Sequence, residues 1–282
     1  MKTGIVLEGG AMRGMFTAGV IDVLLQNKIT FDGCVGVSAG AVFGCNYKSR
    51  QQGRVIRYNK RFAKDPRYCS FRSLIKTGDL YGTEFCYDTL PLHIDIFDIK
   101  AYQENPMKFY TVATDTENGE PVYRQLDKGV GEDLQWYRAS ASMPMVSRPV
   151  IIDGKTYLDG GISDSIPLEF MQRQGYEKNL VVLTQPLGYK KKQPAIMPLF
   201  RLSLRKHPKM IEAMKNRHLM YNRETEYVSE QVKLGNTFVI RPPKKLDIGK
   251  IEHDPEKMQK AYEIGKKTMQ KHLSELKRFL EE

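Results

Sequence analysis

A serine flanked by small residues is the clearest chemical signal in the chain. The pattern is Gly36-Val37-Ser38-Ala39-Gly40, and it lies between an apolar run and a stretch that suits a helix. A tight strand-to-helix turn has room only for small neighbours and leaves the serine hydroxyl pointing into open space. We therefore expect Ser38 to be a nucleophile for acyl transfer. An ordinary glycine-flanked turn is the alternative interpretation.

A glycine-rich segment near the N-terminus provides a second signal. It reads Glu8-Gly9-Gly10-Ala11-Met12-Arg13-Gly14 and separates a predicted strand from a predicted helix. Backbone N–H groups that converge beside the serine would form an oxyanion hole, with Gly9, Gly10, Ala11, Met12, Arg13 and Gly14 as its candidate residues. A dinucleotide-binding loop is the alternative. It is disfavoured because Ala11 stands where that fingerprint needs glycine, and because the next strand ends in a serine rather than an acid.

A carboxylate followed by two glycines provides the third signal. Asp159-Gly160-Gly161 ends a predicted hairpin strand, where glycines leave the carboxylate uncovered. We expect Asp159 to be the base. The other Asp-Gly pair, Asp153-Gly154, lies where the hairpin must turn, and we assign it to that turn. Aspartate is a weak base, with an ordinary pKa of about 3.9, so this role requires a partly desolvated pocket.

These three segments, in this order, resemble the patatin-like phospholipase family. A further stretch, Ala139-Ser140-Ala141-Ser142-Met143-Pro144, is similar to the A-S-x-x-x-P segment of that family. The resemblance covers about residues 3 to 185. It implies an αβα fold and a Ser38–Asp159 dyad in place of a triad. In that mechanism Asp159 takes the proton from Ser38, the alkoxide attacks an ester carbonyl and water later releases the acyl chain. Ala11 departs from the family, since many members have a third glycine there.

The elements that must position these residues alternate between strand and helix. Apolar runs predict strands at residues 2–7, 31–37, 108–113, 150–152 and 155–158, with 180–183 as the last strand. Helical spacing predicts helices at residues 11–26 and 39–48. Successive strand–turn–helix units imply parallel strands with helices on both faces. The predicted fold is a three-layer αβα sandwich with a mostly parallel central sheet.

The charge distribution divides the chain in two. The formal net charge is +11. Residues 189–282 contain 22 basic and 12 acidic side chains, which accounts for +10 of it. We predict a catalytic domain at residues 1–188 and a basic, mainly helical region at residues 189–282. Its last helix is capped by Asp254, begins with Pro255 and has an apolar stripe that should dock on the core.

The basic region indicates a polyanionic partner, either nucleic acid or an anionic lipid surface. Apolar residues alternate with cations at residues 195–209, which fits a membrane-facing lid or an amphipathic helix packed on the core. We expect a lipid or acyl ester substrate, peripheral contact with an anionic membrane surface and no nucleic acid. The apolar run at the N-terminus is too short for a secretory signal and predicts a cytoplasmic protein. The basic region adds the expectation of a peripheral position at the inner membrane face.

Several alternatives remain at this point. The histidines after Asp159 (His207, His218, His253 and His272) could complete a Ser–Asp–His triad. The fold could also serve as a catalytically silent lipid-binding or regulatory module, as a nucleotide-binding oxidoreductase or as a nucleic-acid-binding protein. No cofactor and no metal are expected, because the four cysteines contain no C-x-x-C pair and no ligand cluster has suitable spacing.

Overall fold

The chain folds around one mixed β-sheet of eight strands. The computed structural model describes residues 1–281. Its strands are β1 (Thr3–Leu7), β2 (Gly33–Val37), β3 (Lys108–Asp115), β4 (Pro121–Gln125), β5 (Val150–Ile152), β6 (Lys155–Asp159), β7 (Lys178–Val182) and β8 (Thr237–Ile240). The hydrogen-bonded path through the sheet is β5-β6-β3-β2-β1-β7-β8, and β4 pairs with β3 outside this path. The five strands from β3 to β8 along this path are parallel.

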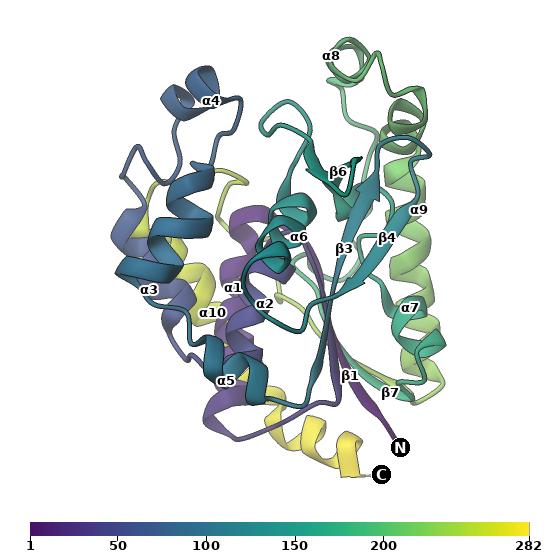
Figure 1. Cartoon of the computed structure of the whole chain (residues 1–282). Coiled ribbons are helices and arrows are strands. Elements are labelled where there is room, and N and C mark those ends of the chain that lie inside the picture. The colour runs from purple at the N-terminus through teal and green to yellow at the C-terminus, as the bar shows by residue number, and fades with distance from the viewer. Residues whose placement is uncertain (282) are drawn as a thin grey trace.

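Helices cover both faces of the sheet (Figure 1). They are η1 (Ala11–Arg13), α1 (Gly14–Gln26), α2 (Ala39–Lys48), α3 (Arg54–Phe62), α4 (Phe71–Thr77), η2 (Phe85–Ile94), α5 (Ile99–Glu104), α6 (Glu132–Ala141), η3 (Gly160–Ile162), α7 (Leu168–Arg173), α8 (Met197–Ser203), α9 (Pro208–Lys233) and α10 (Pro255–Glu281). Helices α1, α2, α3, α6 and α10 share one apolar core with the sheet, and α7 and α9 share a second core on the other face.

Alternation along the strands separates the two cores. In β1, Ile5 and Leu7 belong to the core under α1 and α2, whereas Val6 belongs to the core under α7 and α9. This is the arrangement that a strand buried on both faces requires. The predicted three-layer αβα sandwich with a mostly parallel sheet is confirmed.

Strand β3 pairs with two different strands along one of its edges. Residues 108–112 pair in parallel with β2, and residues 113–115 pair antiparallel with β6. Strand β4 pairs with residues 110–114 and therefore occupies the opposite edge, because each strand has only two edges. Strand β6 therefore pairs with the same edge of β3 as β2 does, beyond the point where β2 ends.

The register of these pairs brings two residues of the predicted site together. Val112 lies opposite Val37, the residue before Ser38, and the next residue of β3, Ala113, lies opposite Asp159. Since both partners lie on the same edge of β3, Ser38 and Asp159 lie beside each other where β6 replaces β2.

Two sequence-based expectations about the elements are wrong. Residues 180–183 are not the last strand, because β8 follows β7 as its parallel neighbour and extends the sheet. The run Thr237–Ile240 has only four residues and follows a helix of 26 residues, so its sequence pattern is too weak to predict a strand. The helix expected from Ala11 begins with the 3-10 turn η1, and the regular helix α1 starts at Gly14. The 3-10 turn holds the end of the glycine-rich loop, so this difference lies at the site itself.

The C-terminal helix docks as its apolar stripe predicts. Met258, Met269 and Leu276 of α10 are fully buried and belong to the core that contains α1. Within residues 1–281, no helix combines the length and the apolar character that crossing a membrane requires.

Candidate active site

Ser38 occupies the turn between β2 and α2. Its backbone has a φ of +53° and a ψ of −122°, in a region that residues with a side chain rarely adopt. The residue is only 7% exposed. Such a conformation costs about 1–3 kcal/mol and persists only where the surrounding structure enforces it. The sequence pattern around Ser38 predicts this strained turn.

Two glycines make the turn sterically feasible. A Cβ atom on Gly36 would lie 2.5 Å from the carbonyl oxygen of Gly40. A Cβ atom on Gly40 would collide with the carbonyl group of Leu7 at the end of β1. A larger side chain at either position would push α2 away from the sheet. The small residues therefore allow the start of α2 to pack directly against β1.

Asp159 ends β6 and is almost fully enclosed by protein, with 3% of its surface exposed. Its backbone N–H donates to the carbonyl oxygen of Ser142 at 2.8 Å. Its Oδ1 accepts the N–H of Gly161 at 2.8 Å. The side chain of Ser38 is near enough to this carboxylate to lower its pKa. These contacts hold the carboxylate in one orientation, toward the serine.

Burial dominates the electrostatics of the Asp159 carboxylate. Removal from water raises its pKa above the ordinary aspartate value, because the charged form is disfavoured where solvent is excluded. The charge of Arg217 and the nearby Ser38 side chain oppose this rise in pKa. A carboxylate with a raised pKa is a stronger base, which removal of a proton from a hydroxyl requires.

One segment braces both residues. The hydroxyl of Ser140, at the end of α6, accepts the backbone N–H of Ser38 at 2.9 Å. The carbonyl oxygen of Ser142 accepts the N–H of Asp159. Both residues belong to the Ala139–Pro144 stretch that the sequence singles out by resemblance, and its contacts give that stretch a physical role. It fixes the Ser38 turn and the end of β6 relative to each other.

The glycine-rich loop lies against the turn of Ser38. A Cβ atom on Gly9 would lie 3.0 Å from the carbonyl oxygen of Val37 and 3.1 Å from the Cβ atom of Ser38. Ala11 adopts a φ of +49°, a backbone conformation that favours glycine. The loop therefore passes directly beside the serine, at the same edge of the sheet.

The backbone N–H groups of the loop fall into two sets. Those of Met12, Arg13 and Gly14 donate to the carbonyl oxygens of Lys250, Gly10 and Ala11 respectively. Within residues 1–281, the N–H groups of Gly9, Gly10 and Ala11 have no protein acceptor. Three unpaired donors thus remain in this loop, and the first of them, Gly9, lies against the Ser38 turn.

Sequence analysis missed several residues that support the site. Glu8 is a buried carboxylate that accepts the hydroxyl of Tyr221 at 2.9 Å and that of Thr184 at 3.1 Å. Arg217 of α9 donates its Nε–H to the carbonyl oxygen of Gly161 at 2.5 Å. Each contact joins residues far apart in the chain, so no local pattern could have revealed it.

The histidines considered for a triad lie elsewhere. His218 contacts the carbonyl oxygen of Lys215, His253 that of Ala63, and His272 the carboxylate of Glu275. In the part of the chain that the structure describes, no histidine is hydrogen-bonded to Ser38 or to Asp159.

Asp153 lies in the exposed turn between β5 and β6, as predicted. Asp153 and Gly154 have φ angles of +50° and +76°, the signs that a two-residue hairpin turn of this type requires. Within residues 1–281, no group of three or more histidine, cysteine, aspartate or glutamate side chains is arranged to hold a metal ion.

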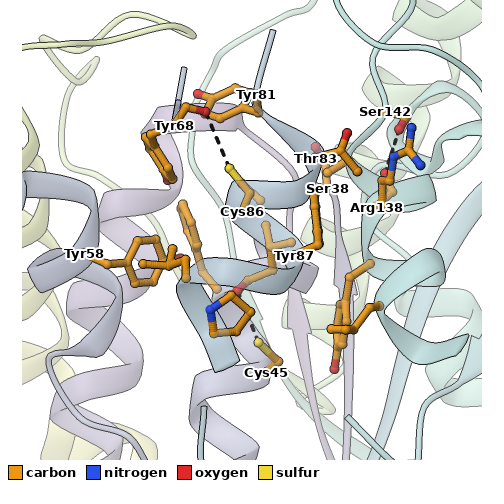
Figure 2. A pocket seen from close by; sticks show the side chains of 18 of the residues that line it. Ser38, Cys45, Tyr58, Tyr68, Tyr81, Thr83, Cys86, Tyr87, Arg138 and Ser142 are labelled. Atoms are coloured by element: carbon orange, nitrogen blue, oxygen red, sulfur yellow. Dashed lines mark hydrogen bonds between the residues drawn. The ribbon is translucent and has the colours of Figure 1, made fainter. Parts of the chain in front are cut away.

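A predominantly apolar cavity of about 160 Å³ opens beside Ser38. Figure 2 shows Ser38 with the tyrosines Tyr58, Tyr68 and Tyr87 along its wall. Its lining also includes Val42, Phe43, Leu90 and Phe97. The arginines in the wall are paired, Arg54 with Asp95 and Arg138 with Asp79. The cavity therefore offers apolar surface without unpaired charge next to the serine hydroxyl.

Comparison with known proteins agrees with this geometry. A family model described as patatin-like phospholipase matches residues 5–171, more than half of the chain. The chain belongs to the patatin-like phospholipase family. A second family model, described as a domain of unknown function (DUF6363), matches residues 207–281 of this patatin-like chain.

Relatives of this patatin-like chain include bacterial and fungal proteins. The uncharacterized protein YjjU of Escherichia coli is 32% identical over 200 residues, which are 66% of this chain and 52% of YjjU. The uncharacterized NTE family protein Rv1063c of Mycobacterium tuberculosis is 27% identical over 59% of this chain and 44% of its own length. Lysophospholipase NTE1 of Lodderomyces elongisporus is 24% identical over 93% of this chain and 18% of its own length. The chain thus spans about half or less of the length of these relatives.

Among solved structures, VipD from Legionella pneumophila matches this patatin-like chain with a TM-score of 0.48 and 12% sequence identity. The match covers 97% of this chain and 67% of that one.

Replacing Ser140 with alanine tests the brace. The variant removes the acceptor of the Ser38 N–H, and an unpaired buried donor costs about 1–3 kcal/mol. We expect the free energy of unfolding, measured by urea denaturation, to fall by that amount. Ser274→Ala, at an exposed position of α10, should change it by less than about 0.5 kcal/mol. Equal stability of the Ser140→Ala and wild-type proteins would contradict the brace.

Proposed function

We propose that the protein hydrolyses acyl esters of lipids, with Ser38 as nucleophile and Asp159 as its base. The observation that carries the proposal is the placement of Ser38 beside a buried carboxylate whose pKa is raised. Membership of the patatin-like phospholipase family supports a lipid substrate, as does the similarity to proteins named lysophospholipase.

The proposed reaction has two stages. Asp159 accepts the proton of the Ser38 hydroxyl while the serine oxygen attacks the ester carbonyl. Collapse of the tetrahedral intermediate breaks the bond to the alcohol, which leaves with the proton from Asp159. Water then gives a proton to Asp159 and attacks the acyl-serine, so that the fatty acid is released and Ser38 regains its proton.

The unpaired N–H groups of Gly9, Gly10 and Ala11 are the donors that we assign to the oxyanion hole. They are supported in this role because they donate to no protein acceptor within residues 1–281, while Gly9 lies against the Ser38 turn and Ala11 lines the same cavity as Ser38. The N–H groups of Met12, Arg13 and Gly14 already have acceptors, so the proposed hole is narrower than the six residues of the sequence motif. Fixed donors of this kind stabilise the charge that develops on the carbonyl oxygen.

The apolar cavity beside Ser38 is the proposed binding site for the acyl chain. Its lining is mostly aliphatic and aromatic, and its arginines are paired with carboxylates. An acyl chain would gain about 0.8 kcal/mol for each methylene group that it buries there. Long-chain esters should therefore bind more tightly than short ones.

Contact with an anionic membrane surface is also part of the proposal. Helix α4 exposes Phe71 and Ile75 next to lysine and arginine side chains, and α8 exposes Leu199 and Leu202 in the same way. Figure 1 shows both helices at the end of the molecule toward which β3 points, the end where Ser38 lies. Apolar side chains among cations suit the interface of an anionic bilayer. We place the protein in the cytoplasm, peripheral to the inner membrane face.

A catalytically silent lipid-binding module is the rival proposal. It would use the same cavity but would not turn over esters. Since Ser38 and Asp159 are both present and lie side by side, we favour the enzyme. Turnover separates the two proposals.

Substitution of the dyad tests the hydrolase directly. We expect Ser38→Ala and Asp159→Asn to lower kcat for p-nitrophenyl acyl esters by about 10³-fold or more, because each removes a group that acts in the transition state. Ser38→Ala should also lose labelling by a fluorophosphonate probe. Asp153→Asn is the matched control, since it changes the same dipeptide in an exposed turn and should keep full activity. A folded wild-type protein that neither turns over esters nor labels would support the lipid-binding module.

The pH dependence of turnover tests the base. Asp159 must be ionised to accept the proton, so kcat/KM for a soluble ester should fall as the pH falls through its pKa. Burial raises this pKa, and the midpoint of the acid limb should therefore lie above the ordinary aspartate value of about 3.9. Full activity down to that value would contradict a desolvated Asp159 base. The variant His218→Ala should leave the profile unchanged, because the hydrogen bond of the His218 ring goes to the carbonyl oxygen of Lys215 and not to the dyad.

Vesicle binding tests the membrane surface. We expect the double variant Leu199→Ser, Leu202→Ser to bind anionic phospholipid vesicles at least about tenfold more weakly in a sedimentation assay, since each leucine loses apolar contact with the bilayer. Leu234→Ser is the control, because this leucine is 71% exposed but precedes the start of β8, at the opposite end of the sheet. Binding of the wild type should weaken as salt is added. Binding that ignores both salt and anionic lipid would contradict the proposal.

A further inference from the structure

The glycine-rich loop is anchored at both ends and left free in the middle. Glu8, which precedes the glycines, accepts the hydroxyl of Tyr221 at 2.9 Å. At the other end, the N–H of Met12 donates to the carbonyl oxygen of Lys250 at 3.3 Å. Between these anchors, the N–H groups of residues 9–11 have no acceptor within the described chain, residues 1–281. The donors assigned to the oxyanion hole therefore depend on the two anchors for their direction.

Both anchors include a residue from the C-terminal part of the chain. Tyr221 belongs to α9, which lies along one face of the sheet (Figure 1). Lys250 lies in the loop before α10. Both residues belong to the segment 207–281 that the second family model matches, whereas the loop itself belongs to the patatin-like segment 5–171. The two matched segments therefore meet at the proposed oxyanion hole.

The contact between Glu8 and Tyr221 is buried and charge-assisted. The two residues are 2% and 1% exposed. Burial, followed by the charge of Glu8, raises the pKa of Tyr221, so the tyrosine hydroxyl keeps its proton and donates to the carboxylate. A hydrogen bond to an ionised group is roughly twice as strong as one between neutral groups. Loss of the hydroxyl would leave one oxygen of a buried carboxylate without this donor.

Thr184, two residues after β7, connects the Glu8 carboxylate to the free donors. Its N–H and its hydroxyl both donate to Oε2 of Glu8, the hydroxyl at 3.1 Å. A Cβ atom on Gly10 would lie 2.7 Å from Oγ1 of Thr184, so the threonine side chain lies directly against this glycine. Tyr221 donates to Oε1, the other oxygen of the same carboxylate. A rotation of the carboxylate would therefore displace the side chain that supports Gly10.

A second contact fixes α9 relative to the proposed base. Arg217 lies four residues before Tyr221, on the same face of the helix. Its Nε–H donates to the carbonyl oxygen of Gly161 at 2.5 Å. The N–H of Gly161 in turn donates to Oδ1 of Asp159 at 2.8 Å. One helix face therefore contacts both the support of the oxyanion loop and the support of the Asp159 carboxylate.

We propose that the segment 207–281 orients the oxyanion hole, with Tyr221 as a positioning residue that acts through Glu8. The inference rests on the proposed hydrolase function and gives the C-terminal segment a part in catalysis. In this role Tyr221 acts on the protein rather than on the substrate. It holds the carboxylate that holds the loop, and the loop directs its N–H groups toward the oxygen that becomes negatively charged. Such donors are effective because their direction is fixed before the reaction begins.

The variant Tyr221→Phe tests this role in the full-length protein, with Tyr262→Phe as its matched control. Tyr262 of α10 donates its hydroxyl to the buried carboxylate of Asp22 in α1 at 2.8 Å. Each variant removes one hydrogen bond from a tyrosine to a buried carboxylate, but only Tyr221 reaches the oxyanion loop. We expect Tyr221→Phe to lower kcat for an uncharged p-nitrophenyl ester at least about tenfold and to change KM less than about twofold. Tyr262→Phe should change both values less than about twofold. Equal effects of the two variants on kcat would overturn the proposal.

A pair of ketones separates positioning of the donors from general support of the fold. When an alkyl trifluoromethyl ketone binds, the Ser38 oxygen adds to the carbonyl carbon, the serine proton passes to Asp159 and the carbonyl oxygen becomes an oxyanion. The matching methyl ketone serves as the unreactive ligand. We expect Tyr221→Phe to weaken the trifluoromethyl ketone by the factor by which it lowers kcat and to leave the methyl ketone unchanged. Equal weakening of both ketones would assign Tyr221 to the fold alone and overturn the proposal.

Hydrogen–deuterium exchange tests the anchor without turnover. The N–H groups of Met12 and Arg13 are hydrogen-bonded to the carbonyl oxygens of Lys250 and Gly10. Exchange in residues 8–14 should be faster in Tyr221→Phe than in the wild type and unchanged in Tyr262→Phe. A wild type that does not hydrolyse the ester, together with this faster exchange, would reject the hydrolase but keep the contact that holds the loop. Turnover by the wild type, with kcat and exchange unchanged in Tyr221→Phe, would reject the positioning role alone.

Discussion

Strand β3 holds β2 and β6 on the same edge, one after the other, and the arrangement of the site depends on this pairing. The backbone register alone places Ser38 and Asp159 side by side, whatever rotamers their side chains adopt. Their separation is therefore controlled by ladder hydrogen bonds, which belong to the most rigid part of the fold. The cavity and the glycine-rich loop are arranged around a pair whose position the sheet has already fixed.

The site combines two unfavourable features with local compensation. Ser38 has a strained backbone and Asp159 is a carboxylate withdrawn from water. The Ser140 hydroxyl and the Ser142 carbonyl oxygen each satisfy a backbone N–H of this pair. Strain and desolvation are useful for the proposed chemistry, since they expose the hydroxyl and strengthen the base. The two apolar cores on the faces of the sheet stabilise the fold and so offset the cost of this strain and desolvation.

The parts of the structure that follow local rules could be predicted from the sequence. The turn at Ser38, the hairpin turn at Asp153 and the apolar stripe of α10 each have a short pattern with a steric or hydrophobic cause. Strand β8 could not be predicted, because four residues after a long helix resemble many loops. The supports of the site, such as Glu8 with Tyr221, join positions more than 200 residues apart. Such contacts exist only once the chain has folded.

Helix α9 lies outside the 5–171 segment that defines the family, yet it reaches the centre of the site. Its Tyr221 donates a hydrogen bond to Glu8, and its Arg217 donates one to the carbonyl oxygen of Gly161, which follows Asp159 in the chain. The geometry of the site therefore depends on both the N-terminal segment and this helix. A graft that exchanged the last third of this chain for that of another family member would have to carry matching partners for Glu8 and Gly161. Among relatives, a substitution in the N-terminal segment that removes one of these contacts should therefore be accompanied by a substitution in the helix that restores it.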